Sequence, residues 1–198
     1  AGTIPISGVN TGTPGGATPV PTLYYSRPFS DHIVTGFGIH VPFGLSTNYD
    51  VGWVGHYHGL KTELKTINLN PSVGLKLTDN LSAGFGFSIQ YLDATFSNAL
   101  DFGLAGFSLG IPGFAPGSAD GAVSIDGSNW GTGFNFGLLY EPMAGARFRL
   151  AYRSQIGNTV TGNASFTDIP LPFQPTFHDQ GFSGTLDLPA SISGNFFL

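Results

Sequence analysis

Charge is scarce in this sequence of 198 residues, because Asp, Glu, Lys and Arg make up only 10% of it, against roughly 25% in a typical soluble domain. There is no cysteine, which excludes a disulfide framework, a thiolate metal site and a cysteine nucleophile. The 7 basic residues form no cluster, so the electrostatic footprint of nucleic-acid binding is missing. No run of about 18 apolar residues occurs, which excludes a transmembrane helix within these residues.

Glycine and aromatic residues are abundant instead, with 30 Gly, 18 Phe and a hydrophobic fraction of 41%. A chain this apolar is not disordered. It also carries too few charged residues to cover a soluble surface comfortably. For an apolar chain without a spanning helix, the β-barrel is the membrane architecture that stays open.

Apolar and polar residues alternate along much of the chain. Between Thr66 and Leu77 every second residue is apolar, and after a turn at 78–80 the pattern resumes as far as Tyr91. A period of two is typical of a strand with one apolar and one polar face. Similar runs cover residues 22–27, 33–44, 129–140, 147–153 and 185–193. The sequence therefore predicts an all-β fold of about seven antiparallel strands, without an amphipathic helix.

Strand and loop lengths favour a transmembrane β-barrel over a soluble β-sandwich, which is the alternative. Several runs reach the roughly 9–11 residues that a tilted strand needs to cross a bilayer, whereas soluble strands peak near 5–6. The connections at 79–80 and 141–146 are short, and those at 45–60, 97–128 and 167–181 are long. This asymmetry is typical of outer-membrane barrels. Aromatic residues near strand ends suit its interfacial girdles, namely Tyr91, Trp130, Tyr140 and Tyr152.

A series of short motifs, in a consistent order, resembles the FadL-type outer-membrane transporters, a family of long-chain fatty acid and toluene/xylene-type hydrocarbon channels. The likeness lies in the segments 68–73 (NLNPSV), 81–86 (LSAGFG), 42–45 (PFGL), 129–135 (NWGTGFN), 151–154 (AYRS) and 188–191 (LPAS). The resemblance implies an antiparallel transmembrane β-barrel of fourteen strands. Residues 1–198 would form about seven of them, as part of a single barrel domain. An N-terminal plug would precede residue 1, and the other strands would follow residue 198.

The function that the resemblance implies is passive uptake of hydrophobic compounds, long-chain fatty acids or hydrocarbons, across the bacterial outer membrane. The full-length protein would be a monomer surrounded by lipid and lipopolysaccharide. No cofactor, metal or catalytic residue is expected, because no nucleophile motif or calcium-loop spacing occurs. His56, His58 and the nearby Asp50 come closest to a metal site, but a polar loop explains them better. A general porin and a structural or adhesive barrel are the alternatives.

Two of the long loops are unusually apolar. Loops normally lie in water and carry polar residues, so an apolar loop indicates a ligand or partner surface, which also argues against a general porin. By resemblance, these loops form an extracellular groove that first captures substrate. The predicted groove residues are Leu100, Phe102, Leu104, Phe107, Leu109, Ile111, Phe114, Leu171, Phe173 and Phe177. Packing of the loops on each other over the barrel mouth is a second, compatible interpretation.

Pro42, Phe43 and Gly44 predict a break in strand pairing. Proline has no backbone N–H to donate, and glycine permits a bulge or kink. The resemblance implies that this strand kinks inward and opens a gap in the barrel wall, through which substrate leaves sideways into the membrane. An ordinary strand end leading into the following loop is the other interpretation.

Arg149 and Arg153 lie on the polar face of their strand and are predicted to point into the lumen. Such an arginine would either hold a substrate carboxylate or pair with Asp93 or Glu63 as part of the structure, and the structural pairing is preferred. Residues 97–146 contain no Lys or Arg, which slightly favours neutral hydrocarbons over fatty acids.

Overall fold

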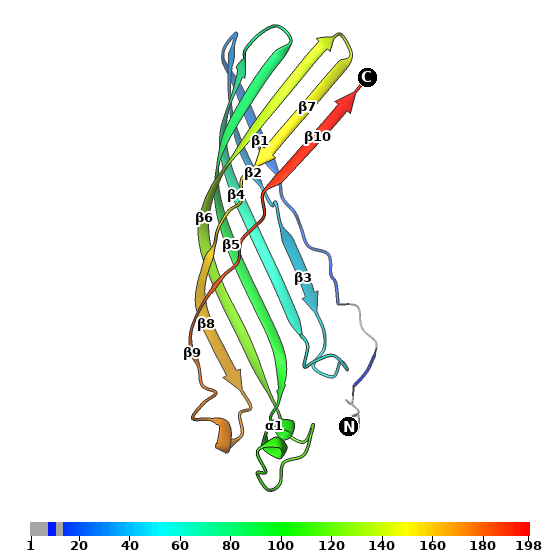
Figure 1. The fold of residues 1–198 in the computed structure, drawn as a ribbon, viewed down its shortest axis with the longest axis vertical. Helices are drawn as coiled ribbons and strands as arrows, with labels where there is room; N and C mark the ends of the chain where they lie inside the picture. The colour runs from blue at the N-terminus through cyan, green and yellow to red at the C-terminus, as the bar shows by residue number, and fades with distance from the viewer. Residues whose placement is uncertain (1–7, 11–13) are drawn as a thin grey trace.

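The computed structural model describes residues 8–10 and 14–198, which form a tall, twisted antiparallel sheet of ten strands (Figure 1). The strands are β1 (Leu23–Ser30), β2 (Ile33–His40), β3 (Gly44–Asn48), β4 (Lys61–Lys76), β5 (Leu81–Asp101), β6 (Asp120–Met143), β7 (Ala146–Arg153), β8 (Thr159–Thr167), β9 (Gln180–Thr185) and β10 (Ser191–Phe197). Two short helical segments, α1 (Phe102–Ser108) and η1 (Leu171–Phe173), lie in the long loops. Among the described residues, no helix is long and apolar enough to cross a membrane.

The ten strands follow seven paths across the sheet, because three of the paths are interrupted. The order is β1-β2-β4-β5-β6-β7-β10. β3 follows β2 along the same edge of β4, and β8 follows β7 along the same edge of β6. β9 pairs with β8, and β10 pairs with β7, so β9 and β10 share the third interrupted path. The predicted all-β antiparallel fold is confirmed.

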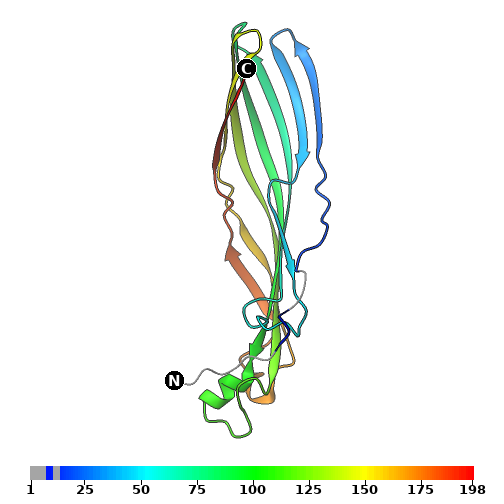
Figure 2. The same cartoon turned by 90° about the vertical axis from the view of Figure 1, so that its right-hand side faces the viewer.

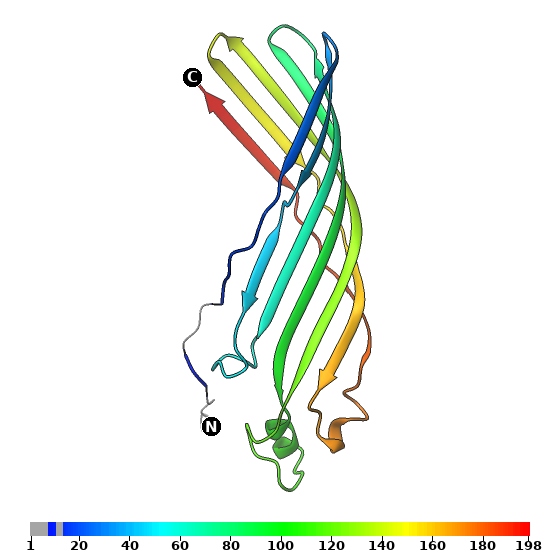
Figure 3. The same ribbon diagram turned by 180° about the vertical axis from the view of Figure 1, so that it is seen from behind.

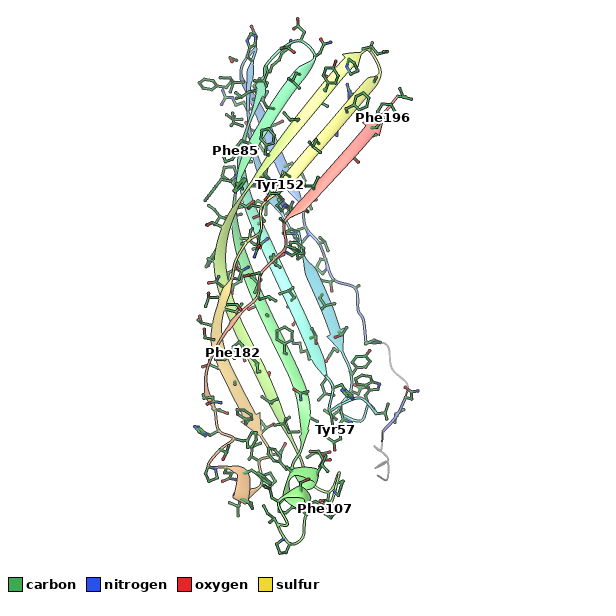
Figure 4. The ribbon with its side chains drawn as sticks, in the orientation of Figure 1. Tyr57, Phe85, Phe107, Tyr152, Phe182 and Phe196 are labelled. Carbon is green, nitrogen blue, oxygen red and sulfur yellow. The ribbon has the colours of Figure 1, made fainter. Side chains whose placement is uncertain are left out.

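The strand register places the apolar residues of neighbouring strands side by side on one face. Phe85 of β5 lies opposite Phe136 of β6, which lies opposite Tyr152 of β7, and Tyr152 lies opposite Ile192 of β10. Figure 4 shows Phe85, Tyr152 and Phe196 in the half of the sheet that carries the short turns. An exposed apolar band on the outer face is the lipid-facing surface of a transmembrane barrel.

The opposite face is concave, since the sheet curls until β2 faces β7 and β10 (Figure 2). A hollow of about 650 Å3 lies inside this curl and is lined by residues of β1, β2, β4, β5, β6, β7 and β10. Its lining includes several glycines, namely Gly36, Gly38, Gly74 and Gly84. This concave face is the lumen side of the sheet.

The distribution of apolar residues between the two faces inverts beyond Tyr91. Tyr91 and Trp130 lie on the outer face with their ring centroids 5.1 Å apart, as expected of an interfacial girdle. The next residue, Leu92, points into the lumen and is fully buried, whereas Lys65 and Asp93 lie opposite each other on the outer face. The 11 residues 81–91 of β5 match the length needed to cross a bilayer. Residues 92–101 therefore extend the wall beyond the membrane.

The loops are shorter than the sequence predicts. β5 runs to Asp101 and β6 begins at Asp120, so the expected loop at 97–128 is wrong for all but residues 102–119. That loop contains α1, although no helix is predicted there. β3, β8 and β9 are also missed by the prediction. Their apolar residues, such as Phe166 and Phe182, are few and face the lumen, so the alternation that marks a lipid-facing strand is weak.

Candidate functional site

The two apolar loops pack on each other through an aromatic cluster of Phe102, Phe114, Phe173 and Phe177. The ring centroid of Phe102 lies 4.9 Å from that of Phe173 and 5.1 Å from that of Phe177, and Phe114 contacts Phe173 at 5.7 Å. Phe102 and Phe173 are buried. These four predicted groove residues therefore form the packed interior between the loops, in which Phe114 and Phe177 are half-buried, and their role in substrate capture stays a prediction.

A second group of predicted groove residues is exposed beside this core and is called the loop surface here. Its members are 41% to 80% exposed and are Leu104, Phe107, Leu109 and Leu171. Figure 4 shows Phe107 on α1, at the end of the molecule remote from the short turns. Leu100 and Ile111 are half-buried. The loops thus combine a packed interior with an apolar surface that faces outward.

Asp101 fixes the position of α1 at the end of β5. One oxygen of its carboxylate accepts a hydrogen bond from the backbone N–H of Leu104 at 2.7 Å, which caps the helix. The same oxygen accepts from the N–H of Gly117 at 3.0 Å, on the return to β6. A side chain at Gly103 would collide with the carbonyl oxygen of Ala115. The loop surface is therefore held on a rigid base.

An apolar layer lines the lumen above the girdle. Leu92, Ala94, Val160 and Leu188 are buried together, and Phe43, Leu64 and Leu186 pack against them. These residues come from both sides of the curled sheet, so the layer extends across the lumen.

A polar layer adjoins the apolar layer on the side of the short turns. It consists of Asn68, Ser88, Gln90, Asn129 and Asn158, of which all but Asn129 are buried. Asn68 Nδ2 donates to Ser88 Oγ at 3.4 Å, and Asn129 Nδ2 donates to Asn158 Oδ1 at 3.3 Å. The side-chain oxygens of Asn68 and Gln90 have no hydrogen-bond partner among the described residues. Such groups bind water or a polar ligand in preference to an alkyl chain.

Arg153 enters this polar region from β7. Its guanidinium Nη2 lies 3.5 Å from His40 Nε2. The preferred pairing with Asp93 or Glu63 is not found among the ion pairs of the described residues, because Glu63 pairs with two lysines of its own strand and Asp93 faces outward. Arg149 lies with its guanidinium carbon 5.6 Å from an aromatic ring of β10. Arg153 is thus a lumen cation without a carboxylate partner in the part of the chain that the structure describes.

The path of β2 and β3 is broken at residues 41–43, as Pro42 and Gly44 predict. His40 lies opposite Asn68 but Gly44 lies opposite Lys65, so three residues face two on β4. Thr66 bridges the break, because its Oγ1 accepts from the N–H of Phe43 at 3.1 Å and donates to the carbonyl of Phe43 at 2.6 Å.

A hollow of about 850 Å3, called the wall gap here, opens beside this break. It is lined by residues 16–21 on one side and by residues 41, 44–46 and 63–67 on the other. Figure 3 shows the segment before β1 running apart from β3. The break in pairing is confirmed, and a role of Pro42, Phe43 and Gly44 in substrate exit stays a prediction.

The predicted polar loop around His56 anchors to the base of the apolar loop. His56 is buried, with Nε2 3.8 Å from Asp120 Oδ2, and the hydroxyl of Tyr57 donates to Asp120 Oδ1 at 2.6 Å. Burial raises the pKa of Tyr57, and its hydrogen bond to Asp120 raises this pKa further. Within residues 8–10 and 14–198, no three potential ligands gather at a metal site.

Sequence reasoning missed Thr66, the polar layer and the segment 16–21. Thr66 and the buried amides occupy ordinary polar positions of strands, and no motif distinguishes them. The prolines at positions 19 and 21 were the available signal for an unpaired segment.

When the chain is compared with known proteins, one family profile matches nearly all of it. The profile of the family described as outer membrane protein transport protein (OMPP1/FadL/TodX) matches residues 6–196. A long-chain fatty acid transport protein of Salmonella typhi is 32% identical over 158 residues, covering 77% of this chain and 36% of that protein.

Solved structures agree on the fold. The crystal structure of a Pseudomonas aeruginosa FadL homologue superposes with a TM-score of 0.80 at 26% identity, covering 89% of this chain and 44% of that one. The Ralstonia pickettii toluene transporter TbuX superposes with a TM-score of 0.65 at 19% identity, covering 89% and 49%. The chain spans half or less of the length of these relatives.

Proposed function

The chain belongs to the OMPP1/FadL/TodX family of bacterial outer membrane transport proteins, and on this premise we propose that the full-length protein takes up hydrophobic compounds passively. The substrate is captured on the loop surface, enters the apolar layer of the lumen, and leaves sideways through the wall gap. No covalent step or cofactor is part of this route. Three features of the described residues support the proposal.

The junction between the lumen and the wall is the observation that carries the proposal. Leu64 packs against the buried apolar layer and also lines the wall gap. On β5, the lumen face leads from Leu100 through Phe96 to Leu92, and so connects the loops with the same layer. An alkyl chain that follows this track stays in contact with apolar side chains, and each Å2 kept from water is worth about 25 cal/mol.

The polar layer supports a sideways exit over a passage straight through the lumen. Beyond Leu92, an apolar molecule would meet the buried amides of Asn68 and Gln90. A buried polar group that an alkyl chain leaves unsatisfied costs roughly 1–3 kcal/mol. The wall gap lies just before this barrier, at the height of Ile67, which pairs with the girdle residue Tyr91. Substrate would therefore leave at the outer interface of the membrane.

Long-chain fatty acids are the substrate class that we favour, with neutral hydrocarbons as the alternative. Arg153 offers the lumen a cation that no carboxylate of the described residues neutralises, next to the polar layer. A fatty acid could then keep its chain in the apolar layer and its carboxylate at Arg153. The relative at 32% identity is a long-chain fatty acid transport protein, whereas the toluene transporter shares only 19%.

A general porin or an adhesive barrel accounts less well for these features. A porin needs a polar, water-filled lumen, which the apolar layer interrupts. An adhesive barrel needs no wall gap and no apolar track between the loops and that gap.

Uptake of labelled oleate by cells that carry the full-length protein tests the proposal. Leu64→Gln should lower uptake of oleate and of a neutral alkane at least tenfold, at an unchanged level of folded protein in the outer membrane. Thr62→Gln is the matched control, because Thr62 is on the same face of β4 but outside the apolar layer and the wall gap. Unchanged oleate uptake in Leu64→Gln, or equal loss in both variants, would contradict the route.

A further inference from the structure

The wall gap is an interrupted seam between two segments that pair at both of its ends. At one end, Leu23 of β1 lies opposite Ile39 of β2. At the other end, the N–H of Asn48 donates to the carbonyl oxygen of Pro14 at 2.8 Å. If the β1–β2 register continued between these points, Pro21 would lie opposite residue 41 and Pro19 opposite residue 43. Residues 16–21 instead line the hollow.

The hydrogen-bond direction of β2 identifies which backbone groups would close this seam. The N–H of Lys76 donates to the carbonyl oxygen of His32 at 2.8 Å, in the register that pairs β2 with β4. In an antiparallel ladder, alternate residues bond to opposite neighbours. Even-numbered residues of β2 therefore bond to β4 and odd-numbered ones to β1. If β1 continued this alternation, positions 19 and 21 would direct their N–H groups across the seam, position 21 toward residue 41. On β3 the extra residue at 41–43 reverses the alternation, so that Asn48 directs its N–H to Pro14.

Both of these positions are proline, which has no N–H. We propose that Pro19 and Pro21 keep the wall gap open by withholding the two backbone donors with which the segment before β1 would pair with the β2–β3 edge. The opposite rim matches this arrangement, since Phe43 already directs its N–H and its carbonyl to Thr66 of β4. Neither rim then offers a complete ladder to the other.

This inference rests on the proposed exit through the wall gap, and it makes Pro19 and Pro21 positioning residues for transport. Restoring both donors should let β1 extend its ladder along the β2–β3 edge and narrow the opening. Substrate would then still be captured and would still enter the lumen, but it would leave slowly.

The test uses the full-length protein with the double substitution Pro19→Val and Pro21→Val. Pro28→Val is the matched control, because Pro28 belongs to the same chain segment but lies within β1, opposite Val34 in the paired part of the strand. The seam is probed by cysteines at Ala17 and Leu45, which line opposite sides of the wall gap and would be opposite each other in a continued register. A disulfide forms only when the two Cα atoms come within about 7 Å.

We expect oxidation with copper phenanthroline to cross-link this cysteine pair at least fivefold faster in the double proline variant than in the wild-type or Pro28→Val background. In the same variants without cysteines, oleate uptake should fall at least fivefold only in the double variant. If that variant does not reach the outer membrane, Pro19→Val and Pro21→Val alone should each give an intermediate cross-linking rate. Unchanged cross-linking in folded variants would overturn the role of the prolines. Faster cross-linking with normal uptake would support it and contradict the exit route.

Discussion

Arg153 of β7 and His40 of β2 approach to 3.5 Å between Nη2 and Nε2, although β4, β5 and β6 lie between their strands. Four steps of about 4.8 Å separate β2 and β7 along the sheet, so the two side chains meet only because the sheet curls around the lumen. The contact joins the end of β2, next to the wall-gap residue Val41, to the opposite wall. It therefore places a cation beside the point where the proposed route turns sideways.

The loop surface should act in capture, whereas the aromatic cluster should act in stability. We expect Phe107→Ser combined with Leu171→Ser to weaken oleate binding to cells in the cold at least fivefold and to leave loop stability unchanged, because both side chains are exposed. Phe173→Ser removes a buried ring and should destabilise the packed loops by about 3 kcal/mol. Faster protease cleavage within residues 102–119 measures that effect. Normal oleate binding by the exposed double variant would remove the loop surface from the mechanism.

Arg153 should discriminate between acids and neutral hydrocarbons. A charge-assisted hydrogen bond contributes about 1.5–3 kcal/mol, so Arg153→Gln should weaken oleate binding to the purified full-length protein about tenfold or more. Binding of toluene or decane should change less than twofold. Arg149→Gln is the control, because Arg149 lies over an aromatic ring and not in the polar layer. Equal losses for oleate and decane would assign Arg153 to structure alone.

Thr66 should hold the break between β2 and β3 in place. Thr66→Val keeps the shape of the side chain but leaves the N–H and the carbonyl of Phe43 without their partner. The free energy of unfolding in urea should fall by about 1–3 kcal/mol, and Thr66→Ser should restore most of it. Equal stability of the Val and Ser variants would show that the hydroxyl does not bridge the break.

The contact between Tyr57 and Asp120 should make the stability of the folded protein depend on pH in the alkaline range. Burial and the hydrogen bond to Asp120 raise the pKa of Tyr57 in the folded protein, above its unfolded value near 10. A raised pKa contributes stability that is complete below the unfolded value and is lost as the pH rises toward the folded one. The stability advantage of the wild type over Tyr57→Phe should be constant from pH 7 to 9 and shrink above about pH 10. An advantage that stays constant to pH 12 would contradict the shifted pKa.

The membrane-spanning half of the sheet follows from the sequence, because its lipid-facing residues are large and regularly spaced. The alternation that ends at Tyr91 marks the girdle correctly. Beyond Tyr91 the apolar side chains lie on the lumen face, beginning with Leu92. In the sequence this inversion is visible as two adjacent apolar residues, at positions 91 and 92. Pro42 and Gly44 also located the break in pairing, because proline lacks a backbone N–H and glycine permits a bulge. The alternation of large lipid-facing residues could not identify β8 or β9, because their few apolar residues face the lumen.

The wall gap and the lumen layers could not be read from the sequence, since they depend on contacts between distant strands. Leu64 and Leu188 meet only after the sheet has curled. The preferred partner of Arg153 was wrong for the same reason, because Asp93 turns to the outer face when the pattern inverts. The division of the predicted groove into buried and exposed residues likewise required the packing of Phe102 against Phe173.

Reversible obstruction of the wall gap tests the central claim most directly. Leu45 lines this gap, and the described chain has no native cysteine, so Leu45→Cys can be labelled with a charged methanethiosulfonate reagent in the full-length protein after any thiol outside these residues has been replaced. The control is Val51→Cys, in an exposed loop position away from the gap. We predict that labelling at position 45 lowers oleate uptake at least fivefold, that reduction restores it, and that labelling at position 51 has no effect. Undiminished uptake with position 45 fully labelled would contradict exit through the barrel wall.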